Sequence, residues 1–110
     1  GKPLHRHQAI QFILADMKTK IEASRLLTWK SAADGDAGVR NTESAAHAKR
    51  FSSDVAMEIA TDAVQVYGGY GYSEEYPVAR LMRGAKVMQI YEGSSQVQRM
   101  IIGREITKGL

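Results

Sequence analysis

The chain has 110 residues, 44% of them hydrophobic and 25% charged, which is typical of one globular domain and not of a disordered segment. It has no cysteine, which excludes disulfides and thiolate metal sites, and no apolar run long enough to span a membrane. The formal net charge of +3 is spread over lysines and arginines that alternate with acidic residues. The continuous basic surface that is typical of nucleic-acid binding is therefore not expected.

A long amphipathic helix is predicted from about His5 to Ala33. Apolar residues recur there at steps of three and four from Ile10 to Leu27, which is the spacing of one buried helix face. The turn-forming residues 34–38 end this helix. Their two aspartates faintly resemble a calcium loop, but the other ligand positions of such a loop are absent, so a simple turn is expected.

A second helix is predicted from the N-cap candidates Asn41 and Thr42 to Gly68. Gly68 and Gly69 suit a left-handed cap at its C-terminal end. The expected buried stripe is rich in small side chains, so that another helix can approach it closely. It comprises Ala48, Ser52, Val55, Ile59, Ala63 and Val66.

Glycines and tyrosines gather between residues 67 and 76, and all five tyrosines of the chain lie between residues 67 and 91. The glycines of residues 68–71 could present backbone N–H groups to a phosphate. A helix precedes them, however, where a dinucleotide-binding fingerprint requires a strand. A turn at the end of a helix is the more ordinary interpretation.

Two further helices complete the prediction. Pro77 suits the first position of a helix that runs to Met88, and a last helix runs from about Ser94 to Thr107. No segment shows the alternation of a strand. Four helices joined by short breaks predict an all-α fold, an antiparallel up-and-down four-helix bundle that forms one domain over residues 1–110.

The break between the last two helices, Tyr91-Glu92-Gly93-Ser94-Ser95, is the most informative stretch. It places a single carboxylate between apolar runs, and apolar surroundings raise the pKa of an acid toward the range of a general base near neutral pH. The two serines and the backbone N–H groups at a helix start can hold an anion. An ordinary helix-cap loop without function is the alternative interpretation.

Other polar residues give weaker signals. His5 and His7 are two positions apart, and His47 lies on another predicted helix. No further ligand completes a set at suitable spacing, so no metal site is expected. Amide side chains near the predicted breaks suit hydrogen bonds to a heterocycle or a ribose, although solvated helix surface explains each of them separately. These amides are Gln8, Gln65, Gln89, Gln96 and Gln98.

Taken together, several stretches resemble the acyl-CoA dehydrogenase family, in the same order and at the same spacing. They are residues 1–4, 7–12, 14–17, 65–72, 75–78, 80–83 and 90–99. The resemblance implies a fragment, namely the C-terminal helical domain of an enzyme whose N-terminal helical domain and middle β-domain are missing. The Arg-x-x-Phe motif that normally precedes the opening glycine is also missing, which agrees with a truncation just upstream.

The resemblance implies an FAD enzyme that oxidises an acyl-CoA to a trans-2-enoyl-CoA, usually as a homotetramer, and passes electrons to an electron-transfer flavoprotein. Glu92 resembles the base that removes the α-proton while the β-hydrogen leaves as hydride to the flavin. Its backbone N–H and a ribityl hydroxyl of FAD would polarise the thioester carbonyl. The fragment alone would be inactive, and the enzyme would work in a bacterial cytoplasm or a mitochondrial matrix.

Further residues carry over by position. Tyr91 and Gly93 resemble residues that bind the substrate, with Tyr91 lining the acyl pocket. Residues that contact the FAD of a neighbouring subunit in the family correspond to Gln8, Gln65, Val66, Tyr67, Gly68 and Gly69. Residues that meet the cofactor at the start of the last helix correspond to Ser94, Ser95 and Gln96.

Two positions depart from the family pattern. Gly84 stands where Asp is usual, which puts an expected ion pair in doubt, and Gln96 stands where Glu is frequent. The competing hypothesis is a helical oligomerisation or interaction module that derives from this family and no longer catalyses a reaction. Such a module would be free to lose the acid, whereas this chain retains Glu92 beside Gly93.

Overall fold

The computed structural model describes all residues from 1 to 110, and it contains helices and no strands. The elements are η1 (Leu4–Arg6), α1 (Gln8–Asp36), α2 (Thr42–Tyr67), α3 (Gly69–Tyr72), α4 (Pro77–Met88) and α5 (Ser95–Ile106). The all-α bundle and its long helices are confirmed. The first of them begins at Gln8 after a short 3-10 turn, instead of at His5, and the single turn α3 was not predicted.

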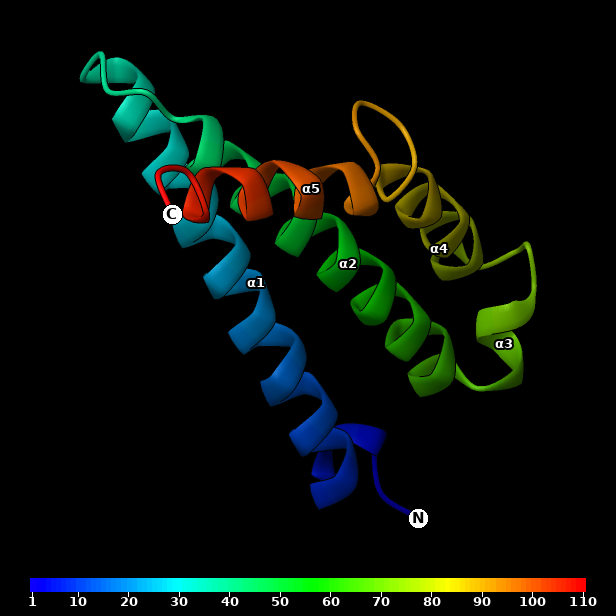
Figure 1. Cartoon of the computed structure of the whole chain (residues 1–110). Helices are drawn as coiled ribbons and strands as arrows, with labels where there is room; N and C mark the ends of the chain where they lie inside the picture. The colour runs from blue at the N-terminus through cyan, green and yellow to red at the C-terminus, as the bar shows by residue number, and fades with distance from the viewer.

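Helix α2 is the centre of the fold. Helix α1 runs antiparallel beside it, while α4 and α5 pack against other parts of it (Figure 1). No Cα atoms of α1, α4 and α5 lie within 8 Å of one another, so these three helices are joined through α2. The small side chains of α2 permit the other helices to approach it closely. Of the predicted stripe, Ala48 and Val55 are buried and the others are half-buried.

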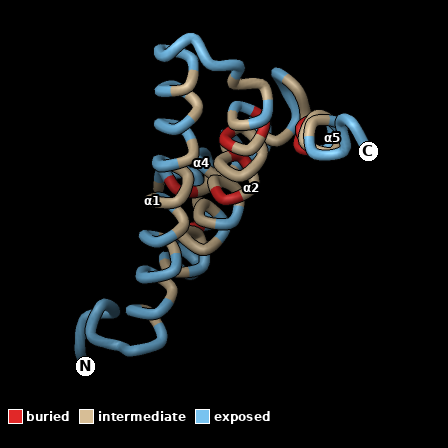
Figure 2. The backbone as a smooth tube through the Cα atoms, turned by 60° about the vertical axis from the view of Figure 1, so that its left-hand side comes forward, coloured by how far each residue is buried: buried red, intermediate tan, exposed pale blue.

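The chain is elongated and buries little of its apolar surface. Its radius of gyration is 17.1 Å, against about 13 Å for a compact domain of this length. Only eight of 110 residues are buried, and Figure 2 shows them on α2 and on the facing side of neighbouring helices. Phe12, Trp29 and Met100 are each more than 60% exposed. Exposed apolar surface of this extent is typical of interaction sites.

The buried face predicted for α1 is wrong for the chain by itself, because no residue of that helix is fully buried. Positions along the predicted stripe are half-buried at best, and Leu14 and Ile21 are exposed. The spacing of the apolar residues is helical as predicted. No second layer of this chain covers the apolar face of α1, because α2 is the only long helix that packs against it.

The glycine and tyrosine stretch forms a packed reversal between α2 and α4. Gly68 ends α2 with a φ of 62°, and its N–H donates to the carbonyl of Gln65. Gly71 is buried against α2, where a Cβ atom would lie 2.4 Å from the carbonyl oxygen of Val64. The ring of Tyr76 packs against Tyr67 and Tyr70, with centroids 6.0 and 5.4 Å apart. The turn at a helix end is therefore the interpretation that the geometry supports.

Gly84 lies in the middle of α4, is exposed, and would bring a Cβ atom within 4 Å of nothing. The neighbouring Arg83 is exposed and makes no ion pair. Replacing Gly84 by Ala should therefore raise the free energy of unfolding by about 0.5–1 kcal/mol, because glycine loses more backbone freedom in a helix. A denaturant titration checks this. A destabilised variant would mean that another surface meets α4 at this position.

Candidate active site

The predicted break between the last two helices is present. Helix α4 ends at Met88 and α5 begins at Ser95, after the N-cap residue Ser94. The Oγ of Ser94 accepts a hydrogen bond from the N–H of Val97 at 3.3 Å. Ser94 therefore caps α5, as the ordinary interpretation of this loop predicts.

Glu92 has an uncommon backbone conformation. It is the only non-glycine residue of the chain with a positive φ, at 54°, and Gly93 follows with a φ of 88°. An L-residue loses roughly 1–2 kcal/mol in the left-handed region. A Cβ atom on Gly93 would lie 2.5 Å from the Nε2 of Gln98, which is itself buried. Strained residues persist only where their surroundings hold them, and they gather at functional sites.

Asp54 of α2 ties together the two ends of this loop. Its Oδ1 accepts a hydrogen bond from the Nε2 of Gln89 at 2.8 Å and from the Oγ of Ser95 at 2.8 Å. The N–H of Ser95 also donates to the carbonyl of Gln89 at 3.0 Å. Because Gln89 follows α4 directly and Ser95 starts α5, one carboxylate fixes both helix ends against α2.

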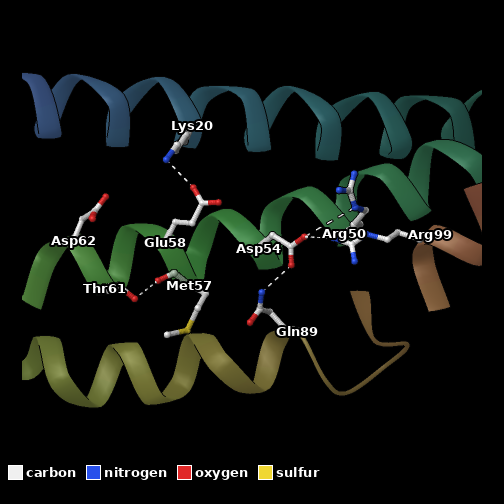
Figure 3. Close-up of a pocket in the computed structure, with 9 residues that line it drawn as sticks. All are labelled: Lys20, Arg50, Asp54, Met57, Glu58, Thr61, Asp62, Gln89 and Arg99. Atoms are coloured by element: carbon white, nitrogen blue, oxygen red, sulfur yellow. Dashed lines mark hydrogen bonds and ion pairs between the residues drawn. The ribbon is translucent and has the colours of Figure 1, made fainter. Parts of the chain in front are cut away.

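The carboxylate of Asp54 lies in a polar hollow that α1, α2, α5 and the start of the loop line together (Figure 3). Arg99 and Arg50 point toward it from 3.8 and 4.0 Å. Partial burial raises the pKa of Asp54, but the hydrogen bonds from Gln89 and Ser95, with the two arginines, outweigh burial and hold the pKa below its usual range. Asp54 is therefore a charged anchor near neutral pH.

The loop presents unpaired backbone donors beside an exposed carboxylate. The N–H groups of Glu92, Gly93, Ser94 and Gln96 donate no hydrogen bond within the chain. The Glu92 side chain is exposed, so this chain does not itself supply the apolar surroundings that were expected for it. Free N–H groups at a helix start can bind an anionic or carbonyl oxygen. A carboxylate and several unpaired backbone N–H donors thus share one turn.

The other predicted site residues lie elsewhere in the fold. Gln8 is the first residue of α1, and residues 65–69 lie where α2 ends, after the segment that carries Asp54. At 1.5 Å per residue, Gln65 lies roughly 16 Å along the helix axis from Asp54. The structure thus brings together residues 91–96, and it keeps residues 65–69 apart from them.

None of the helices combines the length and the apolar character that crossing a bilayer requires. No three His, Asp or Glu side chains gather in an arrangement that could hold a metal ion. His47 lies 3.5 Å from Glu43 on the same helix, and His5 and His7 are exposed.

One protein-family model matches nearly the whole chain. Residues 1–107 match the family model for the acyl-CoA dehydrogenase C-terminal domain. The chain belongs to the acyl-CoA dehydrogenase family. The resemblance seen in the sequence motifs is thereby confirmed, and the long helices described above are those of a C-terminal domain in this family.

Curated relatives support the same family. The chain is 56% identical to a cyclohexane-1-carbonyl-CoA dehydrogenase of Geobacter metallireducens over 98% of its own length and 28% of the relative. It is 59% identical to a short-chain-specific acyl-CoA dehydrogenase of Megasphaera elsdenii over 94% of its length and 27% of the relative. The chain therefore spans between a quarter and a third of these acyl-CoA dehydrogenases.

Solved structures show the same fold. The butyryl-CoA dehydrogenase of Megasphaera elsdenii matches with a TM-score of 0.96 and 56% identity over 98% of the chain and 28% of that protein. A structure described as the electron transferring flavoprotein of Acidaminococcus fermentans matches with a TM-score of 0.96 and 51% identity, with the same coverage. An FAD complex of PigA matches with a TM-score of 0.93 and 26% identity over 97% of the chain and 28% of that protein.

Sequence reasoning missed two residues that shape the loop of this acyl-CoA dehydrogenase domain, Asp54 and Lys49. The Nζ of Lys49 donates to the carbonyl oxygens of Met88 and Gly93. The hydrogen-bond partners of Asp54 and Lys49 lie 35 to 44 positions further along the sequence. A polar residue flanking the small-residue stripe of α2 was the only available signal, and no spacing rule connects it to a loop so distant.

The role of Asp54 predicts a pH-dependent stability. Asp54→Asn should lower the free energy of unfolding by about 1–2 kcal/mol at pH 7, because two hydrogen bonds lose their charged acceptor. The pKa of Asp54 is lower in the folded state than the ~3.9 of an unfolded aspartate. Its contribution is therefore complete above that value and is lost as the pH falls through the folded pKa. Denaturant titrations of both proteins between pH 7 and pH 3 should show the difference shrinking.

A control for this prediction is Asp16→Asn on the exposed surface of α1, where no ion pair is lost. This variant should cost much less stability at pH 7. A gap between wild type and Asp54→Asn that stays constant down to pH 3 would contradict the anchoring role of the charged carboxylate.

Proposed function

We propose that the chain is the C-terminal domain of a flavin-dependent acyl-CoA dehydrogenase, in which Glu92 is the catalytic base. The observation that carries the proposal is the conformation of Glu92. It is the one non-glycine residue in the left-handed region, and the loop on which it lies is tied to α2 at both ends. Glycine or asparagine would suit that backbone better. A glutamate at such a position is best explained by its chemistry.

The reaction proposed is the oxidation of an acyl-CoA to a trans-2-enoyl-CoA. The Glu92 carboxylate takes the α-proton, and the electrons of that C–H bond form the new double bond. The free N–H of Glu92 can donate to the thioester carbonyl oxygen and stabilise the negative charge that develops there. Gly93 lies against the substrate, and Tyr91 lines the acyl pocket.

The cofactor proposed is FAD, which when bound takes up the β-hydrogen as hydride. The start of α5 suits an anionic or polar cofactor atom, because the N–H groups of Ser94 and Gln96 have no partner in the chain. Ser95 differs from them, since its buried hydroxyl donates to Asp54. We therefore assign the Ser95 side chain to anchoring the loop, and its contact with the cofactor remains a prediction.

A homotetramer gives the second group of site residues a role. Gln8, Gln65, Val66, Tyr67, Gly68 and Gly69 would contact the FAD of a neighbouring subunit. The separation of residues 65–69 from the Glu92 loop supports this assignment, because one FAD need not reach both sets of residues. The exposed apolar faces of the chain also favour burial in a larger assembly.

We infer the partner and the compartment from the relatives. An electron-transfer flavoprotein is the proposed electron acceptor, and the match to a structure described by that name supports it. The curated relatives named above are bacterial, which favours a bacterial cytoplasm over a mitochondrial matrix.

The test of this function uses the full-length enzyme with its flavin bound. Flavin absorbance is followed without oxygen while straight-chain acyl-CoAs are added. Rapid bleaching is expected, because hydride transfer reduces the flavin. An absence of bleaching with every acyl-CoA, straight or branched, would contradict the proposal and favour a non-catalytic helical module.

The isolated chain should bind FAD weakly and should be inactive. The chain spans about 28% of its relatives, so most of the walls of the flavin and substrate sites would come from the rest of the enzyme. Titration of the isolated chain with FAD, followed by flavin fluorescence, checks this. Tight stoichiometric binding would show that this domain carries a complete flavin site, which is the opposite of what we expect.

A further inference from the structure

Lys49 of α2 reaches into the loop that carries Glu92. Its Nζ donates to the carbonyl of Met88 and, at 3.4 Å, to the carbonyl of Gly93. It also lies 5.8 Å from the centre of the Tyr91 ring, within the range of a cation–π contact. The two carbonyls lie on opposite sides of Glu92 in the sequence.

An ammonium group suits this position for two reasons. The carbonyl of Met88 is at the C-terminal end of α4, where helix carbonyls lack partners and the helix dipole favours a cation. An ammonium also carries three N–H donors and can serve more than one carbonyl. Lys49 therefore joins the end of α4 to the residue that directly follows Glu92.

The contacts around Glu92 restrict its backbone from both sides. Before it, the N–H of Tyr91 donates to the carbonyl of Val87 at 3.1 Å. After it, the carbonyl of Gly93 accepts from Lys49 and, at 3.2 Å, from the Nε2 of Gln98. Asp54 acts further out, on the side chains of Gln89 and Ser95. Among the α2 residues, Lys49 is the one that hydrogen-bonds to the backbone of the residue after Glu92.

We propose that Lys49 is a positioning residue for Glu92, and this proposal rests on the proposed function of Glu92 as base. By holding the carbonyls of Met88 and Gly93 together, Lys49 keeps Glu92 in its left-handed conformation and aims the carboxylate and the free N–H at the same substrate. Loss of the ammonium relaxes the turn and moves the base away from the α-carbon. The rate of proton removal falls, while the binding of substrate is unchanged.

The experiment uses Lys49→Met in the full-length enzyme. Methionine resembles lysine in length and helix propensity, so α2 is retained. In anaerobic stopped-flow measurements with an acyl-CoA, the rate constant of bleaching at saturating substrate should fall by roughly tenfold to a hundredfold. The amplitude of bleaching and the substrate concentration at half-saturation should not change. A merely structural defect would lower the amplitude instead.

Two matched variants complete the experiment. Lys49→Arg retains donors for both carbonyls and should retain most of the rate. Lys18→Met makes the same chemical change on the exposed surface of α1, where only a pair with Glu22 is lost, and should leave the rate constant unchanged. A Lys49→Met enzyme that bleaches at the wild-type rate would overturn the proposal.

Hydrogen exchange gives a readout that does not depend on activity. The amide of Tyr91 is hydrogen-bonded to Val87 at the end of α4, and the amide of Ser95 is hydrogen-bonded to Gln89 across the loop. In Lys49→Met both amides should exchange faster, while amides in the middle of α2 stay protected. Unchanged exchange at both amides would also overturn the proposal. If the wild-type enzyme itself fails to bleach, the proposed function is wrong, and hydrogen exchange still decides whether Lys49 holds the loop.

Discussion

Replacing Glu92 by Gln in the full-length enzyme is expected to slow flavin reduction by an acyl-CoA by roughly two to four orders of magnitude. The amide has nearly the same shape as the carboxylate but cannot accept the α-proton. The backbone N–H of residue 92 is retained, so the thioester should still bind. Rapid-mixing absorbance without oxygen measures the rate, and a titration of the flavin spectrum with substrate measures binding.

The matched control is Glu74→Gln. Glu74 is exposed, lies outside the helices between α3 and α4, and makes no ion pair. This variant should reduce its flavin at the wild-type rate. If Glu92→Gln did so as well, the base would be a different residue and the proposed role of this loop would be wrong.

Gly71→Ala is expected to cause the largest loss of stability among the glycine substitutions, about 1–3 kcal/mol of the free energy of unfolding. The new Cβ atom would lie 2.4 Å from the carbonyl oxygen of Val64 and 2.8 Å from the Cβ atom of Tyr67. Backbone cannot yield as a flexible side chain can, so α3 must move away from α2. Denaturant titration of the full-length protein gives the change.

Gly84→Ala is the control for Gly71→Ala, because the same methyl group is added to a helical glycine in open space. The two variants should change stability in opposite directions. A Gly71→Ala protein as stable as wild type would show that the reversal after α2 does not pack as described here.

Local interactions explain what could be predicted from sequence. Helix boundaries at Pro77, Ser94 and Gly68 follow from caps and backbone preferences that involve only neighbouring residues. The loop that carries Glu92 was identified from sequence for the same reason, since it lies between two such boundaries. The fold class followed from helical spacing.

Burial was predicted less well, because it depends on what lies opposite a helix. The apolar spacing of α1 was correct, yet Leu14 and Ile21 are exposed, since no second layer of this chain covers them. The half-buried positions on α2 show the same limit. Periodicity identifies an apolar face, but tertiary contacts decide whether that face is covered.

The sequence by itself determined the four long helices, the break around Glu92 and the family, because caps, periodicity and motif spacing are properties of nearby residues. Only the tertiary structure decided how that break is held. The anchors Asp54 and Lys49 come from the middle of α2, 35 to 44 positions before their partners. In our proposal the left-handed backbone of Glu92 also depends on Lys49, because strain of that kind persists only where other contacts outweigh it.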